Sequence, residues 1–485
     1  MNTKINELQP KNVFKFFKQI SEIPHASKDM QRISDYCVEF AKNNGLEYIQ
    51  DEHYNVIIKK PASKGYEHLP AVIIQGHLDM VAEKLGSSDF DFSKDALQLE
   101  IDGDFLYAKD TTLGGDDGIA IAYALAILED DSLKHPAIEA VFTIDEEIGL
   151  IGANLIDTSS LQGKYLLNID SEEEGILLTS CAGGISVINE LEVETTDATG
   201  VSGTIKISGL IGGHSGVEIQ KGRANANKIA GDIILRTKDI MYVVFMDGGK
   251  KDNAICREAR IDFVTPKDNV KQITDMINEI RNEYISRYEG IEDSIEITVE
   301  FGEVKTVKAL TKDVATRAAR LMFESKNGVV AMSKQVQNLV ETSLNIGVLT
   351  QTADKITIIF SVRSSIESEK MAVVKELNCL ATSLNINYVL NGDYPGWAYK
   401  EDSKLREIMS KVYKDMYNED VTIDAIHAGL ECGLFVSKIP GLDAISFGPN
   451  IYDIHTPMER LSVSSTKRVY EYIIAVLEAF NCEEQ

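Results

Sequence analysis

Short apolar runs alternate with amphipathic stretches through the first 186 residues, and several of the runs end on glycine, histidine or acidic residues. The runs at residues 71–75 (AVIIQ), 138–144 and 164–169 are rich in branched or aromatic residues, which is typical of buried strands in a parallel sheet. Helical spacing of apolar residues predicts helices that begin near Pro10 and Ser27. The pattern therefore predicts an α/β fold with a mixed, largely parallel sheet flanked by helices.

Polar side chains that can bind a metal ion or transfer a proton follow these runs. The stretch TIDEEIGLIG places Glu146 and Glu147 directly after a buried strand, and His77 and Asp170 follow two other runs. The glycine-rich turn of TTLGGDDGI adds Asp116 at the start of a predicted helix. An exposed acidic turn would explain the glutamate pair alone, and a helix cap would explain Asp116 alone. Because ligand crevices lie at the carboxyl ends of parallel strands, the repeated placement favours one site at this edge.

The hydrophobic pattern changes near residue 187. From there to residue 390, strands and amphipathic helices alternate with few glycine-acid turns, which predicts a separate α+β domain. Residues 391–485 resume the earlier pattern, with a last buried strand (LDAISFGP) that leads to His455 and a closing amphipathic helix. We therefore predict a catalytic domain in two segments, residues 1–186 and 391–485, with residues 187–390 inserted between them.

The bulk composition restricts the partners and the compartment. A chain of 485 residues is longer than a single hydrophobic core normally organises, so more than one domain is expected. The chain has 76 acidic and 49 basic residues, which give a formal net charge of −27. That charge repels nucleic acids and anionic membranes, so neither is predicted as a partner. The six cysteines form no CxxC pair, and the sequence shows neither a signal-peptide core nor an apolar span of membrane length. These features predict a cytoplasmic protein with reduced thiols.

The candidate metal ligands are nitrogen and oxygen donors without sulfur: His77, Asp116, Glu147, Asp170 and His455. Such a set suits Zn²⁺, Mn²⁺ or Co²⁺. These ligands are too many for one open zinc ion but fit two ions that share a bridging carboxylate and bind a water between them. The three ligand carboxylates, together with Glu146 as the fourth negative charge, would balance the charge of two divalent ions.

A set of motifs carries a resemblance to a known family: GHLDMV, TLGGDDGI, DEEIGLIGA, NIDSEEEG, GGHSG, HAGLECG and IHTPMER. Across nearly its whole length the chain resembles the zinc-dependent M20 peptidases, and within them the aminoacyl-histidine dipeptidases, also called cytosol non-specific dipeptidases. The whole set is highly specific, whereas GxHSG or a glutamate pair alone would not be. The resemblance implies a zinc-peptidase-like catalytic domain with an inserted α+β lid domain.

The resemblance also implies how the ligands share two zinc ions. His77 and Asp170 would hold one ion, Glu147 and His455 would hold the other, and Asp116 would bridge both. Co²⁺ or Mn²⁺ are the expected substitutes for zinc. In related enzymes the peptide bond after the bridging aspartate is cis, so a cis bond is expected after Asp116.

Three further residues take catalytic roles by the same resemblance. Asp79 would lie behind His77 and orient its ring. Glu146 would act as general base, taking a proton from the attacking water and delivering it to the leaving amine. His214 of GGHSG, in the lid, would stabilise the tetrahedral oxyanion.

The substrate-binding candidates carry less distinctive motifs. Arg363 of SVRSS would bind the substrate carboxylate through its planar guanidinium, although pairing with a surface acid would also explain it. Asn253 is a candidate for nearby polar contacts, and Glu431 of HAGLECG is a candidate for the free amino group of the substrate. His427 fits a packed structural histidine equally well.

The predicted function is that of a zinc metallopeptidase that hydrolyses unblocked dipeptides, including Xaa-His. Two alternatives stay open. An M20 amidohydrolase acting on N-acylated amino acids would share the metals and the base. It would not need an acidic side chain to bind a free ammonium group of the substrate. A catalytically silent metal-binding scaffold would have no need of Glu146. The expected partner is a small dipeptide, and a monomer and a homodimer formed through the lid both fit the sequence.

Overall fold

The computed structural model describes residues 5–481. The chain forms two compact units, and each is described by itself. Unit 1 comprises Met1–Cys181, Trp397–Ala425 and Leu430–Gln485, and unit 2 comprises Ala182–Gly396 and Ile426–Gly429. The boundaries predicted at residues 187 and 390 both fall inside unit 2.

The long insertion starts and ends at two neighbouring residues of unit 1. The backbone N–H of Cys181 donates to the carbonyl oxygen of Trp397, and the reverse bond is also made, both at 3.0 Å. Both residues are buried. For this insertion the chain therefore leaves unit 1 and returns to it at one place, and Ile426–Gly429 is a second, short excursion into unit 2.

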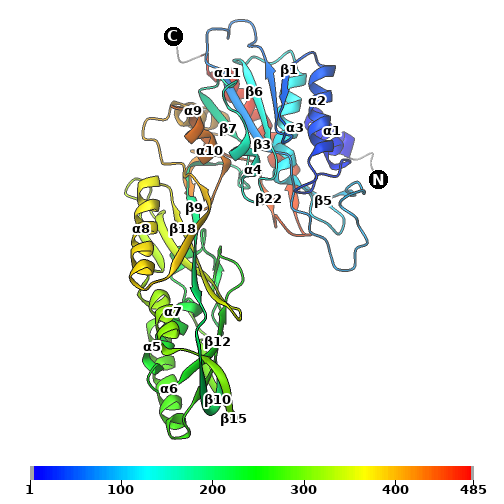
Figure 1. Ribbon diagram of the computed structural model, residues 1–485. Coiled ribbons are helices and arrows are strands. Elements are labelled where there is room, and N and C mark those ends of the chain that lie inside the picture. The colour runs from blue at the N-terminus through cyan, green and yellow to red at the C-terminus, as the bar shows by residue number, and fades with distance from the viewer. Residues whose placement is uncertain (1–4, 482–485) are drawn as a thin grey trace. The chain divides into compact units, whose positions relative to one another are not determined.

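Unit 1 is built on an eight-stranded mixed sheet with the order β1-β2-β6-β3-β7-β21-β8-β20 (Figure 1). Its strands are β1 (Glu47–Gln50), β2 (Val56–Lys60), β3 (Val72–His77), β6 (Ile138–Thr143), β7 (Tyr165–Asn168), β8 (Ile176–Cys181), β20 (Thr422–Ile426) and β21 (Asp443–Ser446). The parallel pairs lie at the centre, where β3 pairs with β6 and β7, and β7 pairs with β21. Every residue of β3 and β6 is buried, as expected for strands covered on both faces. The predicted α/β fold with a mixed sheet is confirmed, with the parallel part at its centre.

Helices pack around this sheet. They are α1 (Lys11–Ser21), α2 (Gln31–Asn43), α3 (Gly115–Glu129), α4 (Ile151–Leu155), α9 (Lys404–Tyr417), α10 (Glu431–Lys438), α11 (Val463–Ala479) and the short η1 (Ile5–Glu7). α3 is apolar and buried on all sides after its first turn, because it contacts both β3 and α1. A small second sheet has the order β22-β23-β5-β4 and is formed by β4 (Leu99–Asp102), β5 (Phe105–Ala108), β22 (Ile451–Tyr452) and β23 (Arg460–Ser462).

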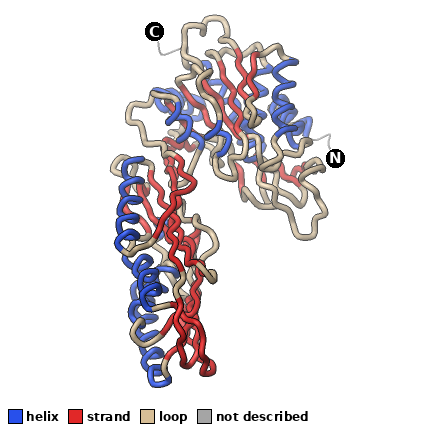
Figure 2. Tube along the Cα trace, viewed as in Figure 1, coloured by secondary structure: helices blue, strands red, loops and turns tan. Residues whose placement is uncertain are grey.

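Unit 2 contains a nine-stranded antiparallel sheet, with helices along it (Figure 2). Its strands are β9 (Gly183–Glu192), β10 (Thr195–Ser208), β12 (Tyr242–Gly248), β14 (Ala259–Thr265), β15 (Glu296–Leu310), β16 (Gly328–Met332), β17 (Val340–Gln351), β18 (Lys355–Ser364) and β19 (Asn387–Tyr394). The order is β15-β10-β14-β12-β17-β18-β9-β19, and β16 pairs with β17. The remaining elements are α5 (Ala226–Thr237), α6 (Val270–Arg287), α7 (Lys312–Glu324), α8 (Glu367–Ser383), η2 (Ile219–Lys221), η3 (Lys267–Asn269) and the pair β11 (Gly213–His214) and β13 (Ala254–Ile255). Apolar residues of the helices and of the sheet form one core.

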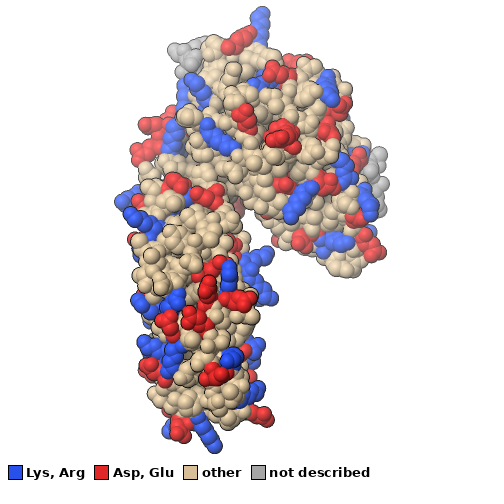
Figure 3. All heavy atoms as spheres, in the orientation of Figure 1, with Lys and Arg blue, Asp and Glu red and all other residues tan. Residues whose placement is uncertain are grey.

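Neither unit offers a helix suited to a membrane. Across residues 5–481, each helix is either too short or too polar to span a bilayer. On the face seen in Figure 3, acidic and basic side chains are interspersed over both units.

Candidate active site

The predicted metal ligands converge at the carboxyl edge of the parallel strands in unit 1. β3 ends on His77, the turns after β6 and β7 carry Glu147 and Asp170, and Asp116 lies at the start of α3. His455 follows β22 in the loop that leads to β23. Because β6, β3 and β7 are parallel, their carboxyl ends open on one side of the sheet. Each of these three strand ends thus delivers one donor to the same place.

Asp116 lies between two histidines. Its Oδ1 is 3.1 Å from His77 Nε2, and its Oδ2 is 3.1 Å from His455 Nε2. Asp170 Oδ1 is 3.7 Å from His77 Nε2, and Glu147 Oε1 is 3.0 Å from His455 Nε2. The side chains therefore form two sets of three donors, each set within 4.8 Å, and the two sets share Asp116. Glu146 lies within the same distance of His77 and Glu147.

The surroundings of His77 define its tautomer. Its Nδ1 lies 3.0 Å from the carbonyl oxygen of Asp79, which only accepts, so Nδ1 carries a proton. In the neutral ring the lone pair of Nε2 then faces the carboxylates of Asp116 and Asp170. Such groups repel at these distances unless a proton or a metal ion lies between them. Burial lowers the pKa of His77, but hydrogen bonds to Asp116 and Asp79 outweigh it and hold that pKa well above its usual range. A metal ion would supply a positive charge for all three donors, so the residues fit a bound cation.

Asp79 connects His77 to the turn that bears the glutamate pair. Its Oδ1 accepts a hydrogen bond from the backbone N–H of Glu146 at 2.9 Å and lies 3.4 Å from His77 Nδ1. Its Oδ2 accepts from the hydroxyl of Ser27 at 2.8 Å. The helix predicted to begin near Ser27 begins only at Gln31, and the Ser27 hydroxyl bonds to Asp79 instead of capping that helix. Asp79 therefore orients both the His77 ring and the Glu146 backbone.

Burial sets the electrostatics of the carboxylates. Burial raises the pKa of Asp170 well above its usual range, and it raises the pKa of Glu146 to about 8. Glu147 Oε1 is buried and accepts no hydrogen bond, although His455 Nε2 lies close to it. Carboxylates crowded out of water in this way are stabilised by cations. The oxygen and nitrogen donors, without sulfur, suit zinc, manganese or cobalt.

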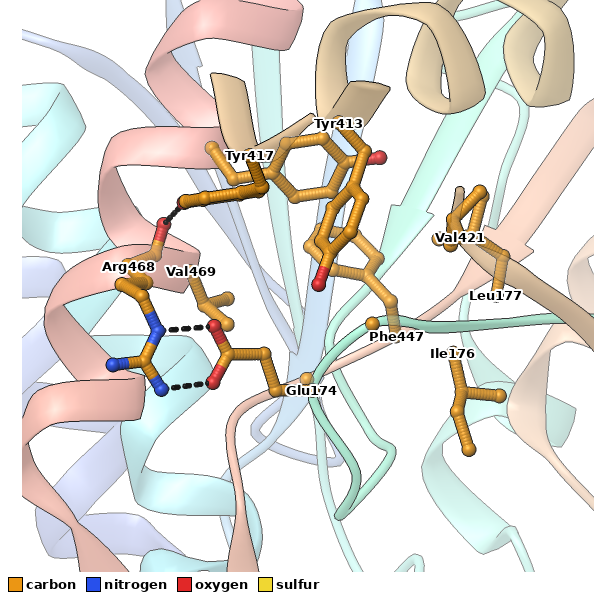
Figure 4. A pocket seen from close by; sticks show the side chains of 12 residues that line it. Glu174, Ile176, Leu177, Tyr413, Tyr417, Val421, Phe447, Arg468 and Val469 are labelled. Carbon is orange, nitrogen blue, oxygen red and sulfur yellow. Dashed lines mark hydrogen bonds and ion pairs between the residues drawn. The ribbon is translucent and has the colours of Figure 1, made fainter. Parts of the chain in front are cut away.

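The segment that follows Asp170 is tied to other parts of unit 1. Glu174, a few residues after Asp170, forms a two-pronged ion pair with Arg468 of α11, from Oε1 to Nε at 2.6 Å and from Oε2 to Nη2 at 2.5 Å (Figure 4). The backbone N–H of Glu174 donates to Asn450 Oδ1 at 2.8 Å, in the segment just before β22, the strand that precedes His455. The segment after Asp170 is therefore anchored to α11 and to the start of β22, the strand that leads to His455.

Glu431 begins α10 and is completely buried beside the strand ends. Its Oε2 accepts hydrogen bonds from the Thr143 hydroxyl at 2.6 Å and from the side-chain amide of Gln75, whereas its Oε1 has no partner. Burial raises the pKa of Glu431 to about 7. One oxygen of this carboxylate thus remains available to a donor.

In unit 2, Arg363 belongs to a row of facing residues on four neighbouring strands. Ser343 on β17 faces Arg363 on β18, Arg363 faces Gly184 on β9, and Gly184 faces Tyr394 on β19. Facing residues project from the same side of a sheet. Gly184 makes room for the Tyr394 ring, because a Cβ at Gly184 would lie 2.5 Å from Tyr394 Oη. The Tyr394 hydroxyl accepts a hydrogen bond from Arg363 Nη1 at 3.0 Å.

This row holds buried polar atoms that lack partners. Arg363 is 8% exposed, and its Nε has no hydrogen-bond partner. His427 is buried and bonds through Nε2 to Ser343 Oγ at 2.8 Å, while its Nδ1 has no partner. Burial, followed by the charge of Arg363, lowers the pKa of His427 to about 3, so its ring is neutral. A buried guanidinium with a free N–H suits an anion such as a carboxylate.

His214 lies on β11 and has a defined tautomer. Its Nδ1 accepts hydrogen bonds from the backbone N–H groups of Gly216 and Val217, both at 3.2 Å, so the proton of the neutral ring is on Nε2. Burial, followed by the charge of Arg363, lowers the pKa of His214. A neutral imidazole with this tautomer can donate a hydrogen bond from Nε2 to an oxyanion.

Asn253 adjoins the His214 segment. Its backbone carbonyl accepts a hydrogen bond from the N–H of Ser215 at 2.9 Å, and its side chain is exposed. Asn345 Nδ2 donates to the carbonyls of the two residues that flank Asn253, both at 2.9 Å. The backbone around Asn253 is therefore held in place while its side chain faces solvent.

A comparison of the sequence with known families decides the identity of the fold. The profile of peptidase family M20/M25/M40 matches residues 73–479. The chain belongs to peptidase family M20. The family resemblance of the sequence motifs and the prediction of a metallopeptidase are confirmed.

Relatives of this M20 chain cover nearly its whole length. The cytosol non-specific dipeptidase of Escherichia coli (strain K12) is 34% identical over 481 residues, which are 98% of this chain and 99% of that protein. The crystal structure of aminoacylhistidine dipeptidase from Vibrio alginolyticus has a TM-score of 0.91 at 36% identity and covers 98% of both chains. The aminopeptidase PepT from Bacillus cereus, at 15% identity and a TM-score of 0.57, covers 98% of this chain and 99% of its own and shares the fold.

The structure groups the residues suggested by the M20 motifs according to the two units. Unit 1 brings the five ligand candidates, Asp79, Glu146 and Glu431 to one edge, and the bond between Asp116 and Asp117 is cis, as the resemblance implies. Unit 2 carries His214, Asn253 and Arg363. Sequence reasoning missed Tyr394, because the motif-poor stretch NGDYPGW gives no sign of its bond to Arg363.

Proposed function

We propose that this M20 peptidase hydrolyses unblocked dipeptides, including Xaa-His, with two divalent metal ions and with Glu146 as general base. The observation that carries the proposal is the carboxylate of Asp116, whose two oxygens face two different histidines while Glu146 lies within reach of the same cluster. Relatives that match over the full length are named as a non-specific dipeptidase and an aminoacylhistidine dipeptidase. Their names support a dipeptide as the substrate.

Zinc is the metal that we propose for both positions. His77, Asp116 and Asp170 would hold one ion, and Asp116, Glu147 and His455 would hold the other. When bound, such a pair of ions polarises the substrate carbonyl and lowers the pKa of water. The mixed nitrogen and oxygen donors favour zinc, with Co²⁺ and Mn²⁺ as substitutes.

Glu146 performs the proton transfers in this proposal. Its carboxylate takes a proton from the attacking water and returns it to the nitrogen of the leaving amine, so the peptide C–N bond breaks as an amine and a carboxylate form. Its backbone is held by Asp79, which fixes the side chain's starting point. A carboxylate kept out of bulk water has a raised pKa, and this suits a base that works near neutral pH.

The ends of the dipeptide require two opposite charges. Glu431, with its unpartnered Oε1, is the proposed acceptor for the substrate ammonium group. Arg363, with its unpartnered Nε, is the proposed donor for the substrate carboxylate, and Asn253 is a neighbouring polar candidate. His214, with its proton on Nε2, is the proposed donor to the oxyanion.

The compartment and the assembly belong to the same proposal. The E. coli relative is named a cytosol enzyme, and we propose the cytoplasm for this chain. A homodimer formed through the lid domain stays a prediction beside a monomer, and light scattering would distinguish the two masses.

The direct test compares the initial rates of the zinc-loaded enzyme on alanyl-histidine and on its N-acetylated form, with Glu146→Gln as the blank. A faster rate on the free dipeptide, lost in Glu146→Gln, is the expected result. Preference for the acetylated peptide would reassign the enzyme to the amidohydrolases. Binding of two zinc ions without activity on either would favour a silent scaffold.

A further inference from the structure

Glu459 is a buried glutamate that faces a cluster of backbone N–H groups in unit 1. The residue is 2% exposed. Its Oε2 accepts hydrogen bonds from the backbone of Leu113 at 2.7 Å and Gly114 at 3.1 Å, and its Oε1 accepts from Gly115 at 2.8 Å and Asp116 at 3.3 Å. Successive N–H groups of one short segment thus converge on a single carboxylate.

The convergence has a local cause in the backbone. Gly114 adopts a left-handed conformation with φ of +67°, and α3 begins immediately after it. The backbone stays non-helical through Asp116 and Asp117, so the N–H groups before them are free to point to one side. A left-handed residue among successive N–H groups gathers them into an anion-binding concavity. Glu459 fills this concavity with a negative charge from a segment far away in the sequence.

Glu459 also joins two loops that carry proposed metal ligands. It lies four residues after His455, and its own backbone N–H donates to the carbonyl of Thr456 at 3.1 Å. The N–H groups that it binds include that of Asp116 itself. One side chain therefore fixes the loop of His455 against the loop of Asp116, the two residues whose Nε2 and Oδ2 lie 3.1 Å apart.

We propose that Glu459 is a positioning residue for the metal centre, which acts by holding the Asp116 backbone so that the carboxylate can serve both metal positions. This proposal rests on the proposed function, because it takes Asp116 and His455 as ligands. Glu459 itself binds no metal in this scheme. If Glu459 only stabilised the segment that leads into α3, its loss would lower protein stability but leave the metal affinity unchanged. This difference makes the proposal testable.

Glu459→Gln is the decisive substitution because it preserves the shape of the side chain. A glutamine amide replaces one acceptor oxygen with an N–H donor, which would face the backbone N–H groups of the concavity and be repelled. We expect the zinc affinity of the weaker position to fall about 10- to 100-fold, as for other groups that support a ligand from behind. Titration of the metal-free protein with zinc against a chromophoric chelator measures this directly and needs no activity.

Glu139→Gln is the matched control in the same unit. Glu139 is 4% exposed, and its carboxylate accepts hydrogen bonds from the backbone N–H groups of Gln162 and Gly163, at the opposite end of β6 from the glutamate pair. The Glu139 carboxylate also lies 3.5 Å from Lys59 Nζ. The substitution therefore disturbs a buried carboxylate that binds backbone N–H groups, without touching a ligand loop. The control should lower the melting temperature by a similar amount and leave both zinc affinities unchanged.

Glu459→Asp provides a second variant in case Glu459→Gln fails to fold. It keeps the charge but shortens the side chain, so its zinc affinity should lie between those of wild type and Glu459→Gln. Wild-type zinc affinity in both Glu459 variants, or an equal fall in Glu139→Gln, would overturn the positioning role. If Asp116→Asn binds two zinc ions as tightly as wild type does, the proposed metal site itself is wrong. This outcome is distinct from one that contradicts only the positioning role of Glu459.

Discussion

The metal-ligand edge of unit 1 and the arginine row of unit 2 assemble polar groups in different ways. In unit 1 the donors stand at the ends of parallel strands or in adjoining loops, each supplied by a separate stretch of sequence. In unit 2 the groups sit within antiparallel strands, and register alone places Ser343, Arg363 and Tyr394 side by side. The strand ends of unit 1 bring together carboxylates that a cation would stabilise. The arginine row of unit 2 holds one buried guanidinium, that of Arg363, whose Nε has no hydrogen-bond partner. The two regions should therefore respond differently to substitution.

The largest effect should come from the unit 1 edge. Glu146→Gln removes the group that accepts and returns the proton, so kcat should fall about 10²- to 10⁴-fold. Zinc content should stay at the wild-type level, because Glu146 is not among the proposed ligands. Steady-state rates on alanyl-histidine and metal analysis of the same sample check both statements.

Glu173→Gln is the control for that substitution. Glu173 is exposed and lies in the acidic stretch after Asp170. The substitution Glu173→Gln removes one negative charge, as Glu146→Gln does, but should leave kcat within the error of the wild-type value. A comparable loss in Glu173→Gln would mean that the general field of the edge, rather than a proton transfer by Glu146, sets the rate.

Arg363→Lys tests the row and should act on substrate binding rather than on turnover. Lysine keeps the charge but loses the planar fork and the bond to Tyr394, so KM for a free dipeptide should rise roughly 10- to 100-fold. A dipeptide with a C-terminal amide should show a much smaller change, because it lacks the carboxylate. Arg260→Lys, which alters an exposed pair with Asp262 in the same unit, should change neither value.

Tyr394→Phe should have the smallest effect. It removes only the hydroxyl that holds Arg363, so KM should rise about 2- to 10-fold with kcat unchanged. Tyr388→Phe on the same strand, where the ring is 42% exposed, is the control and should behave as wild type. Gly184→Ala should act in the same direction, since a Cβ there would displace the Tyr394 hydroxyl. An unchanged KM in both Tyr394→Phe and Gly184→Ala would show that the row does not hold the arginine in its working position.

The contrast also explains what the sequence alone could predict. The unit 1 edge was predictable because an apolar run followed by a histidine or an acid is a local pattern, and parallel pairing brings the ends together. Tyr394 was not predictable as a partner of Arg363, because strand register is absent from local sequence patterns. The same holds for Glu459, which meets the start of α3 only in the folded chain.

Two fold boundaries were less visible for physical reasons. The start of unit 2 lies between β8 and β9, which are separated by the single residue Ala182, so no loop composition marks the change. The four residues Ile426–Gly429 belong to unit 2 although both neighbouring segments belong to unit 1, and so short an excursion has no hydrophobic period of its own. Long elements such as α3 were visible because their periodicity extends over several turns.

The paired bonds between Cys181 and Trp397 have a consequence for how this architecture can change. A segment whose two ends meet on adjacent residues of its host can be enlarged, shortened or exchanged while the host sheet keeps its connections. Replacing Ala182–Gly396 by a short linker, together with a substitute for Ile426–Gly429, would leave the eight-stranded sheet with all of its strands except the end of β20. Unit 1 is therefore a module onto which another insertion could be grafted between Cys181 and Trp397, provided that the short segment Ile426–Gly429 is also replaced.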